Sequence, residues 1–116
     1  MTNANSVAPL FEGKAPEVRE AFDHLVTQLR SFGQVKVAPK QASIHLEKNS
    51  GFAGVHPRKA YFNLEFRTDY KIDHPRITRI QQLSARRFEH TLRVEKASDI
   101  DEQLLGWLKD AYELSK

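Results

Sequence analysis

The stretch that decides the fold is Tyr61-Phe62-Asn63-Leu64-Glu65-Phe66-Arg67, in which a large apolar residue occupies every second position. Successive side chains of a β-strand point to opposite faces of the sheet. Phe62, Leu64 and Phe66 therefore line one face, and the residues between them line the other. This period of two predicts a strand with one face on a core and the other in water.

Four further segments show the same alternation. The predicted strands are Val35–Val37, Ser43–Glu47, Phe52–Val55 and Arg87–Val94. Pro39 ends the first of them because proline has no N–H to donate to a sheet ladder, and Asn49-Ser50-Gly51 supplies residues that suit a tight turn. The links between the first four strands are too short for crossovers, so these strands are predicted to pair antiparallel.

Two segments carry apolar residues at the spacing of a helix that lies on a core. From Pro16 to Phe32 these residues recur at steps of three and four. Pro16 suits the first helical turn, and Gly33 suits the position just beyond the end. A second helix is predicted to open where Ser98 and Asp101 resemble a capping box and to run nearly to the C-terminus. Its apolar residues are Ile100, Leu104, Leu105, Leu108, Ala111 and Tyr112.

The segment from Thr68 to Ala85 has no single period. Asp73-His74-Pro75 is typical of a turn. Ile77, Ile80 and Leu83 follow one another at intervals of three, which indicates one or two turns of helix. This segment is therefore predicted to be a loop with a short helix.

Together these elements predict the α+β class: an antiparallel sheet of about five strands with N-terminal and C-terminal helices packed on one face. The chain has 116 residues, of which 40% are hydrophobic, and this suffices for one core but hardly for two. Residues 1–8 are mostly small and polar without periodicity. We expect them to form a flexible N-terminal arm, followed by a single α+β domain over residues 9–116.

The absence of cysteine excludes several kinds of chemistry. The chain has no disulfide, no thiol nucleophile and no thiolate metal ligand, which suits a cytoplasmic protein. The first ten residues hold no basic patch followed by an apolar run, and nowhere do eighteen apolar residues follow one another. Neither secretion nor contact with a membrane is expected.

Three short segments carry a resemblance to a known family. They are Leu10-Phe11-Glu12-Gly13-Lys14, Phe52-Ala53-Gly54-Val55 with Pro57 and Lys59, and Leu104-Leu105-Gly106-Trp107-Leu108 with Ala111-Tyr112. From about Pro9 to Tyr112 the chain resembles a family of small bacterial domains of unknown function, which occur alone or at the C-terminus of longer chains. Some are loosely labelled predicted transport proteins. The resemblance bears on the fold and implies no catalytic residue, and the transport label has no support in a chain without an apolar span.

Basic residues are concentrated in the second half of the chain. Between Arg58 and Arg93 nine Lys and Arg stand against four Asp and Glu, an excess of five, so the rest of a chain with total charge +3 is net negative by two. Such asymmetry can mark an anionic partner, although it also fits an ordinary solvated surface.

On the sheet face away from the helices, arginines lie beside an aromatic residue. The contact residues predicted for a noncatalytic binding or interaction module are Tyr61, Arg67, Arg87 and Arg93. These residues could bind phosphates and stack a base, which would suit a nucleic acid. A protein is the other partner considered for this surface. Glu65 and Glu89 stand on the same face, and cross-strand pairing with the arginines is the alternative.

A second basic patch surrounds the irregular segment and consists of Arg76, Arg79, Arg86 and Arg87. It fits a loop kept soluble by charge equally well. Val55 and Tyr61 could instead bury themselves against another subunit, and Lys36 and Lys40 could protect a sheet edge. Monomer and homodimer both stay open.

Histidines give the runner-up function, a small enzyme or ligand-binding domain with a histidine-containing pocket between sheet and helices. His56 and His90 could line this pocket if their strands pair in the right register. His90 lies among apolar residues, which also fits a core histidine bonded to the backbone. No histidines have the helical spacing of metal ligands, no hydroxyl sits in a nucleophile motif and the glycines are scattered, so no catalytic residue, metal or cofactor is predicted.

Overall fold

The computed structural model describes residues 6–115 of the chain. Its elements are η1 (Ala8–Phe11), α1 (Pro16–Leu29), β1 (Lys36–Pro39), β2 (Ile44–Glu47), β3 (Gly51–Pro57), β4 (Phe62–Thr68), β5 (Ile77–Ser84), β6 (Arg87–Val94), η2 (Ala97–Asp99) and α2 (Glu102–Leu114). The predicted α+β class is confirmed, with six strands rather than five. Most of the predicted N-terminal arm, residues 1–5, lies outside the described residues, and Ala8–Phe11 forms a short 3-10 turn before α1.

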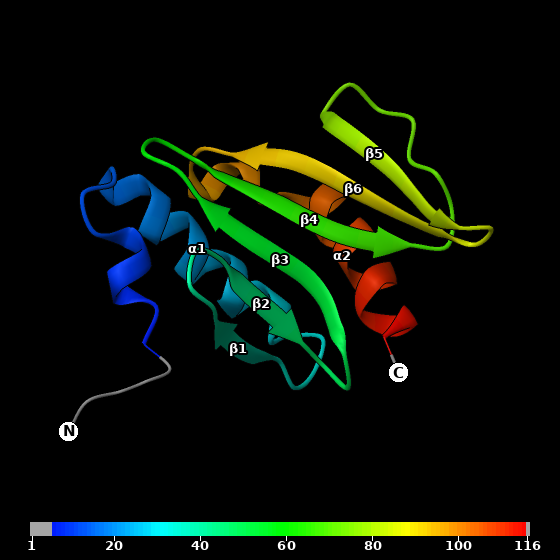
Figure 1. Ribbon diagram of the computed structural model, residues 1–116, viewed down its shortest axis with the longest axis horizontal. Coiled ribbons are helices and arrows are strands. Elements are labelled where there is room, and N and C mark those ends of the chain that lie inside the picture. Colours follow the sequence, from blue (N-terminus) through cyan, green and yellow to red (C-terminus); the bar gives the residue numbers. More distant parts are fainter. Residues whose placement is uncertain (1–5, 116) are drawn as a thin grey trace.

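The six strands form one antiparallel sheet in the order β1-β2-β3-β4-β6-β5. The first four strands follow one another as neighbours. The chain then leaves β4, forms β5 at the edge and returns as β6 between them (Figure 1). The two edge strands are therefore β1 and β5.

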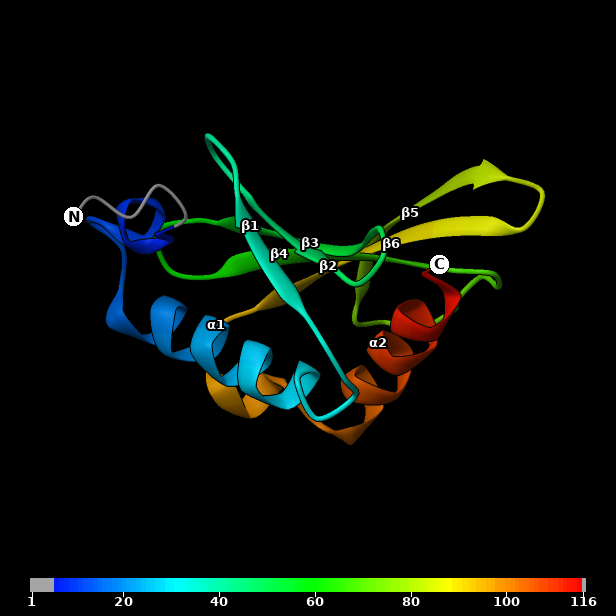
Figure 2. The same cartoon turned by 90° about the horizontal axis from the view of Figure 1, so that it is seen from below.

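Both α-helices lie on the same side of the sheet, as Figure 2 shows from below. Between them and the strands lies the core, to which β4 contributes the side chains of Phe62, Leu64 and Phe66, each at most 1% exposed. Leu25 of α1 and Leu104 of α2 are fully buried against it. The alternation from Tyr61 to Arg67 thus predicted the core face correctly, because burial of the apolar side chains fixes the register of the strand.

The prediction of a loop with a short helix between Thr68 and Ala85 was wrong for its second half. Ile77–Ser84 is strand β5, which pairs with β6. Its register shifts between Ile77 and Arg79 and again between Gln82 and Ser84. Each such bulge inserts an extra residue, so Ile77 and Ile80 face the same side although they are three residues apart. A spacing that indicated a helix therefore belongs to a bulged strand.

Two helix boundaries also differ from the sequence prediction. The helix α2 begins at Glu102 rather than at Ser98, and Asp101 is its N-cap, because the Asp101 carboxylate accepts the Leu104 N–H. The helix α1 ends at Leu29, so Gly33 lies beyond the C′ position. Gly33 has φ +150°, and its missing side chain leaves room for the Tyr112 ring.

Candidate functional site

The sheet face away from the helices, here called the open face, carries the residues in which the sequence predicted a contact surface. The predicted residues fall into two groups. At one end the Arg93 guanidinium lies 4.0 Å from the centre of the Tyr61 ring and 3.9 Å from the Glu95 carboxylate. At the other end Arg67 Nε lies 3.3 Å from Glu89 Oε2. Glu89 and Arg93 are four residues apart on β6, a distance of about 13 Å, so the two groups are separate.

In this arrangement two arginines of the open face already have partners, so the open face is less suited to bind an anion. Arg67 is paired across the strands with Glu89, and Arg93 is stacked on Tyr61. A nearby carboxylate offsets the charge of each of these arginines, Glu89 for Arg67 and Glu95 for Arg93, so both attract an anion less strongly than an unpaired arginine does. Of the four predicted contact residues, Arg87 makes no ion pair within residues 6–115, and its guanidinium donates to the Arg86 carbonyl.

His56 and His90 do not come together, because they lie on opposite faces of the sheet. His56 is on the open face, where its Nε2 lies 2.7 Å from Glu65 Oε1. His90 is fully buried on the helix side and stacks on Phe66 with 5.4 Å between ring centres. Its Nε2 accepts the Ile72 N–H at 3.0 Å, and burial lowers the pKa of the His90 ring. His90 therefore has the environment of a core histidine.

A shallow hollow of about 110 Å³ lies on the open face above Gly54. His45, His56 and Glu65 stand around it, with the Arg67–Glu89 pair at its rim. A Cβ at Gly54 would still keep 3.8 Å from Glu65 Oε1 and from His56 Nε2, so the glycine leaves little extra room. No group of three or more His, Cys, Asp or Glu within residues 6–115 is placed to hold a metal ion.

The β5–β6 hairpin (residues 77–94) is the part of the sheet with the least cover. Figure 2 shows that its outer part extends past α2, with no helix beneath it. A groove of about 410 Å³ runs along its helix side and is lined by Lys71, Ile77, Thr78, Arg79, Ile80, Gln82 and Phe88. Ile80 is 36% exposed and Leu83 46% exposed. Apolar side chains that would normally be buried against a helix are thus open to water.

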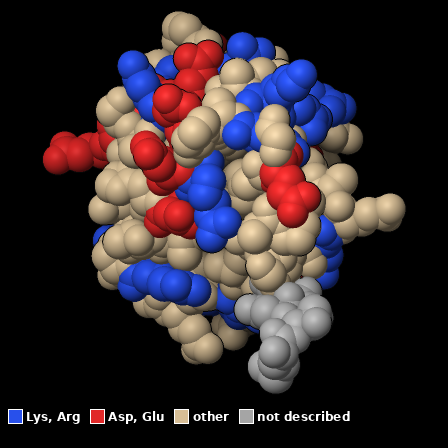
Figure 3. Space-filling view, turned by 90° about the vertical axis from the view of Figure 1, so that its left-hand side faces the viewer, with Lys and Arg blue, Asp and Glu red and all other residues tan. Residues whose placement is uncertain are grey.

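The same hairpin concentrates positive charge. It carries four arginines against one carboxylate, Glu89, which is paired with Arg67. Arg79, Arg86 and Arg87, here called the unpaired arginines, are exposed and make no ion pair within residues 6–115. Figure 3 shows the opposite end of the molecule, where Lys and Arg lie interspersed with Asp and Glu. On the hairpin itself, basic side chains outnumber acidic ones by four to one.

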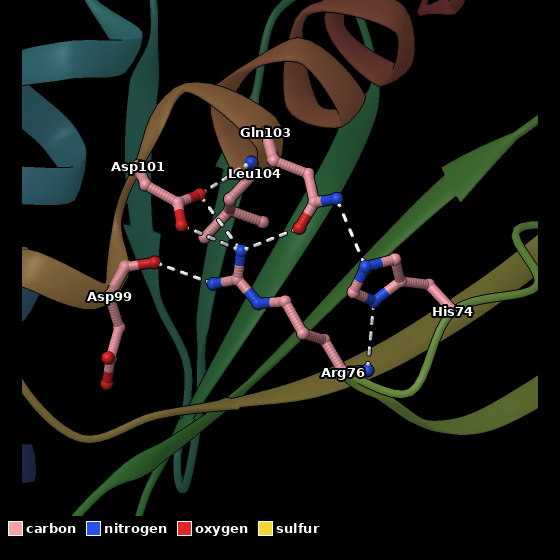
Figure 4. A network of polar contacts seen from close by, with 6 residues as sticks. All are labelled: His74, Arg76, Asp99, Asp101, Gln103 and Leu104. Carbon is pink, nitrogen blue, oxygen red and sulfur yellow. Dashed lines mark hydrogen bonds and ion pairs between the residues drawn. The ribbon is translucent and has the colours of Figure 1, made fainter.

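The segment that leads into β5, residues 69–76, is fixed to α2 by a polar network (Figure 4). Arg76 Nη1 donates to both oxygens of Asp101 at 2.9 and 3.0 Å, and its Nη2 donates to the Asp99 carbonyl at 2.7 Å. The N–H of Leu104 and the guanidinium of Arg76 both lower the pKa of Asp101. Arg76, which the sequence placed in a basic patch, is thus a structural residue.

Two further contacts hold the same segment. The Tyr70 hydroxyl donates to an Asp110 oxygen at 2.5 Å, and burial together with this carboxylate raises the pKa of Tyr70. Ile72 is buried, and its N–H donates to His90. The hairpin therefore projects from a segment anchored to both the helix and the sheet.

Sequence reasoning noticed the charge of Arg79 and Arg86 but not the surface to which they belong. The signal was the excess of arginine in a segment that was expected to be a loop. Once Ile77–Ser84 is a strand, Arg79 and Ile80 become parts of one edge, and Arg86 lies in the turn that follows it.

The fold and these contacts define a small α+β domain with a six-stranded antiparallel sheet and two α-helices. The chain belongs to the family described as Domain of unknown function (DUF5655), whose family model matches residues 7–115. This agrees with the resemblance to a family of domains of unknown function. No curated protein and no solved structure matches the chain. No helix within residues 6–115 has the length and apolar character needed to span a bilayer.

Proposed function

We propose that this chain is a noncatalytic binding module that takes an acidic partner on the β5–β6 hairpin. The observation that carries the proposal is the coincidence of unpaired positive charge and uncovered apolar surface on one projecting element. Arg79, Arg86 and Arg87 lack carboxylate partners within residues 6–115, and Ile80 and Leu83 are exposed beside them. An apolar patch rimmed by polar groups is typical of an interaction site.

Electrostatics favours this position over the open face. An unpaired guanidinium attracts an anion without first losing a partner, whereas Arg67 and Arg93 already have one. Asp69 and Asp73 precede the hairpin and lower the potential near Lys71. The contact is therefore assigned first to the unpaired arginines, and the attraction should weaken with salt, since charges at a surface are screened within about 10 Å at 0.1 M salt.

Part of the contact surface predicted from the sequence belongs to the proposed surface. Arg87 stays in the contact, and Arg67 lies next to it across a shallow groove that also contains Ser50 and Phe52. Tyr61 and Arg93 are left out because they lie at the other end of the open face, where Glu95 offsets the charge of Arg93.

The test is fluorescence anisotropy with labelled acidic peptides, single-stranded RNA and double-stranded DNA, first at low salt and then across a salt series. The triple variant Arg79→Ala/Arg86→Ala/Arg87→Ala should weaken binding of the preferred probe by about tenfold or more, since it removes three charged contacts. The matched control is Arg30→Ala/Lys36→Ala/Lys40→Ala, which removes three exposed positive charges near the other edge of the sheet.

The two variants change the net charge equally, so their comparison separates a local surface from general attraction. Equal losses in both would mean that only net charge matters, and absence of binding at low salt would remove the proposal. A response to RNA or DNA that exceeds the response to every peptide would assign the unpaired arginines to phosphate.

A further inference from the structure

We infer that the partner is an extended acidic peptide segment, which pairs with β5 as a seventh strand of the sheet. This inference rests on the proposed function and names the class of partner for the same surface. It follows from the edge that β5 leaves open, from the groove beside that edge and from the charge along it.

The edge of β5 is available for pairing. β6 is its one strand partner in the described part of the chain, and residues 78–84 are all exposed. An edge strand presents a row of backbone N–H and C=O groups without partners, and an extended peptide can satisfy them by adding a strand. In Figure 1 the segment at residues 69–76 runs beyond the outer edge of β5, and in Figure 2 it passes on the helix side of the hairpin, so it does not lie in the plane of the strands.

The two edges of the sheet differ in how they are protected. β1 has four residues and ends at Pro39, and a short strand with proline is a usual way to prevent pairing. β5 has eight residues without proline, and its two bulges lie near its ends. Its middle part, Arg79 to Gln82, is paired in regular register with β6 and offers a straight edge.

The groove beside the edge determines which kind of side chain the added strand needs at every second position. Ile77, Ile80 and Phe88 are the apolar residues of the groove, which Lys71, Thr78, Arg79 and Gln82 also line. Successive side chains of a strand alternate between faces, so alternate residues of the peptide would lie over these apolar groups. The intervening residues would lie on the other face, to which Arg79 belongs because it pairs with Thr91 of the open face. The recognised pattern is therefore an alternation of apolar and acidic residues.

Charge argues against a second copy of the chain in this place. From Pro75 to Phe88 the sequence holds four arginines and no Asp or Glu. Two β5 strands side by side would bring Arg79 of each copy onto neighbouring strands, with Arg86 and Arg87 of each copy at the hairpin turn, and like charges on paired strands are destabilising. An acidic peptide supplies the opposite charge. A single-stranded nucleic acid would need exposed aromatic side chains for stacking, but Phe88 is half-buried and Tyr61 is covered by Arg93. The exposed Tyr70 is held by its hydrogen bond to Asp110.

The experiment uses the full chain and a labelled seven-residue peptide that alternates Glu with Val and Ile, with blocked ends. Two derivatives carry two backbone N-methyl groups each, on the third and fifth residues or on the fourth and sixth. The N–H groups of successive residues point to opposite edges of a strand, and those of every second residue point to the same edge, so only one derivative loses the donors that face β5. Its binding should weaken about tenfold, and the other derivative should bind like the parent.

Amide hydrogen exchange of the protein gives a second readout that needs no variant. The parent peptide should slow exchange in β5, and the derivative that binds weakly should not. Equal binding of both derivatives, with the loss in Arg79→Ala/Arg86→Ala/Arg87→Ala retained, would overturn strand addition and leave the proposed function standing. Absence of binding by every acidic peptide and nucleic acid would overturn both. A protein that sediments as a dimer with β5 already protected would overturn the inference by assigning the edge to a second copy.

Discussion

His90 shows how one buried side chain connects the sheet to the segment that leads into β5. Its ring is 0% exposed and stacks on Phe66, and its Nε2 accepts the Ile72 N–H. The proton of the neutral ring is therefore on Nδ1, which has no hydrogen-bond partner within residues 6–115. A second proton on Nε2 would face the Ile72 N–H and break this bond. Burial lowers the pKa of the ring for the related reason that a charged ring loses its hydration.

Acid should therefore destabilise the fold through His90. The pKa of the folded state lies below the ordinary 6.5, so below pH 6.5 the unfolded chain holds the extra proton more readily. The stabilisation is complete above this pH and is lost as pH falls towards the folded pKa, by at most about 1.4 kcal/mol per pH unit. Urea unfolding at pH 7.5 and pH 5.0 should show a smaller loss for His90→Phe than for the wild type. The exposed His45→Phe is the control, and a loss for His90→Phe as large as that of the wild type would contradict this role.

Gly33 makes room for Tyr112, and this close approach can be tested. A Cβ at Gly33 would lie 2.5 Å from the Tyr112 hydroxyl oxygen, which donates to the Gln34 carbonyl. Gly33→Ala must displace the ring, so thermal or urea unfolding should show a loss of about 1–3 kcal/mol. Gly106 in α2 has no atom within 4 Å of its added Cβ, and Gly106→Ala should instead stabilise by about 0.5–1 kcal/mol. Unchanged stability of Gly33→Ala would mean that the Tyr112 ring is not held in place.

At the scale of elements, the start of α2 combines a helix cap with an anchor for the neighbouring segment. Asp101 caps the helix through the Leu104 N–H and binds Arg76 through both carboxylate oxygens. Asp101→Ala removes both contacts and should cost about 1–2 kcal/mol in urea unfolding. Asp101→Asn keeps an oxygen for the cap and loses an ion pair whose Asp101 side chain is 50% exposed, so it should cost less than about 1 kcal/mol. Equal losses for the two variants would show that the cap contributes nothing.

The elements differ in how well their sequences predict them. β4 and α1 were predicted correctly because a single periodicity runs through each of them, and the apolar residues that recur with this period are buried in the core. β5 was missed because two bulges break its alternation, and bulges depend on the neighbouring strand rather than on local sequence. The start of α2 was placed three residues too early, since Ser98 and Asp101 both have capping side chains and only the tertiary contact with Arg76 distinguishes them. The positive charge of the candidate site was visible in the sequence. Its position could not be predicted, because it depends on residues 77–84 forming strand β5.

At the scale of the whole molecule, the strands of the sheet differ in how far the rest of the chain covers them. β3, β4 and β6 lie in the middle, while β5 is exposed along nearly its whole length. Native-state hydrogen exchange should therefore be fastest in β5 and slowest in β4, because local opening is easiest where few apolar groups are buried. β1, the other edge strand, is the internal comparison. Exchange in β5 as slow as in β4 would show that another group covers this edge in solution.

The difference between the two edges also sets how many partners the sheet can join. β1 closes one end with four residues and Pro39, and β5 leaves the other end open. A domain with a single open edge is monovalent: it takes one strand and offers no second position from which a chain of copies could grow. Complexes formed through β5 should therefore have one-to-one stoichiometry and a finite size.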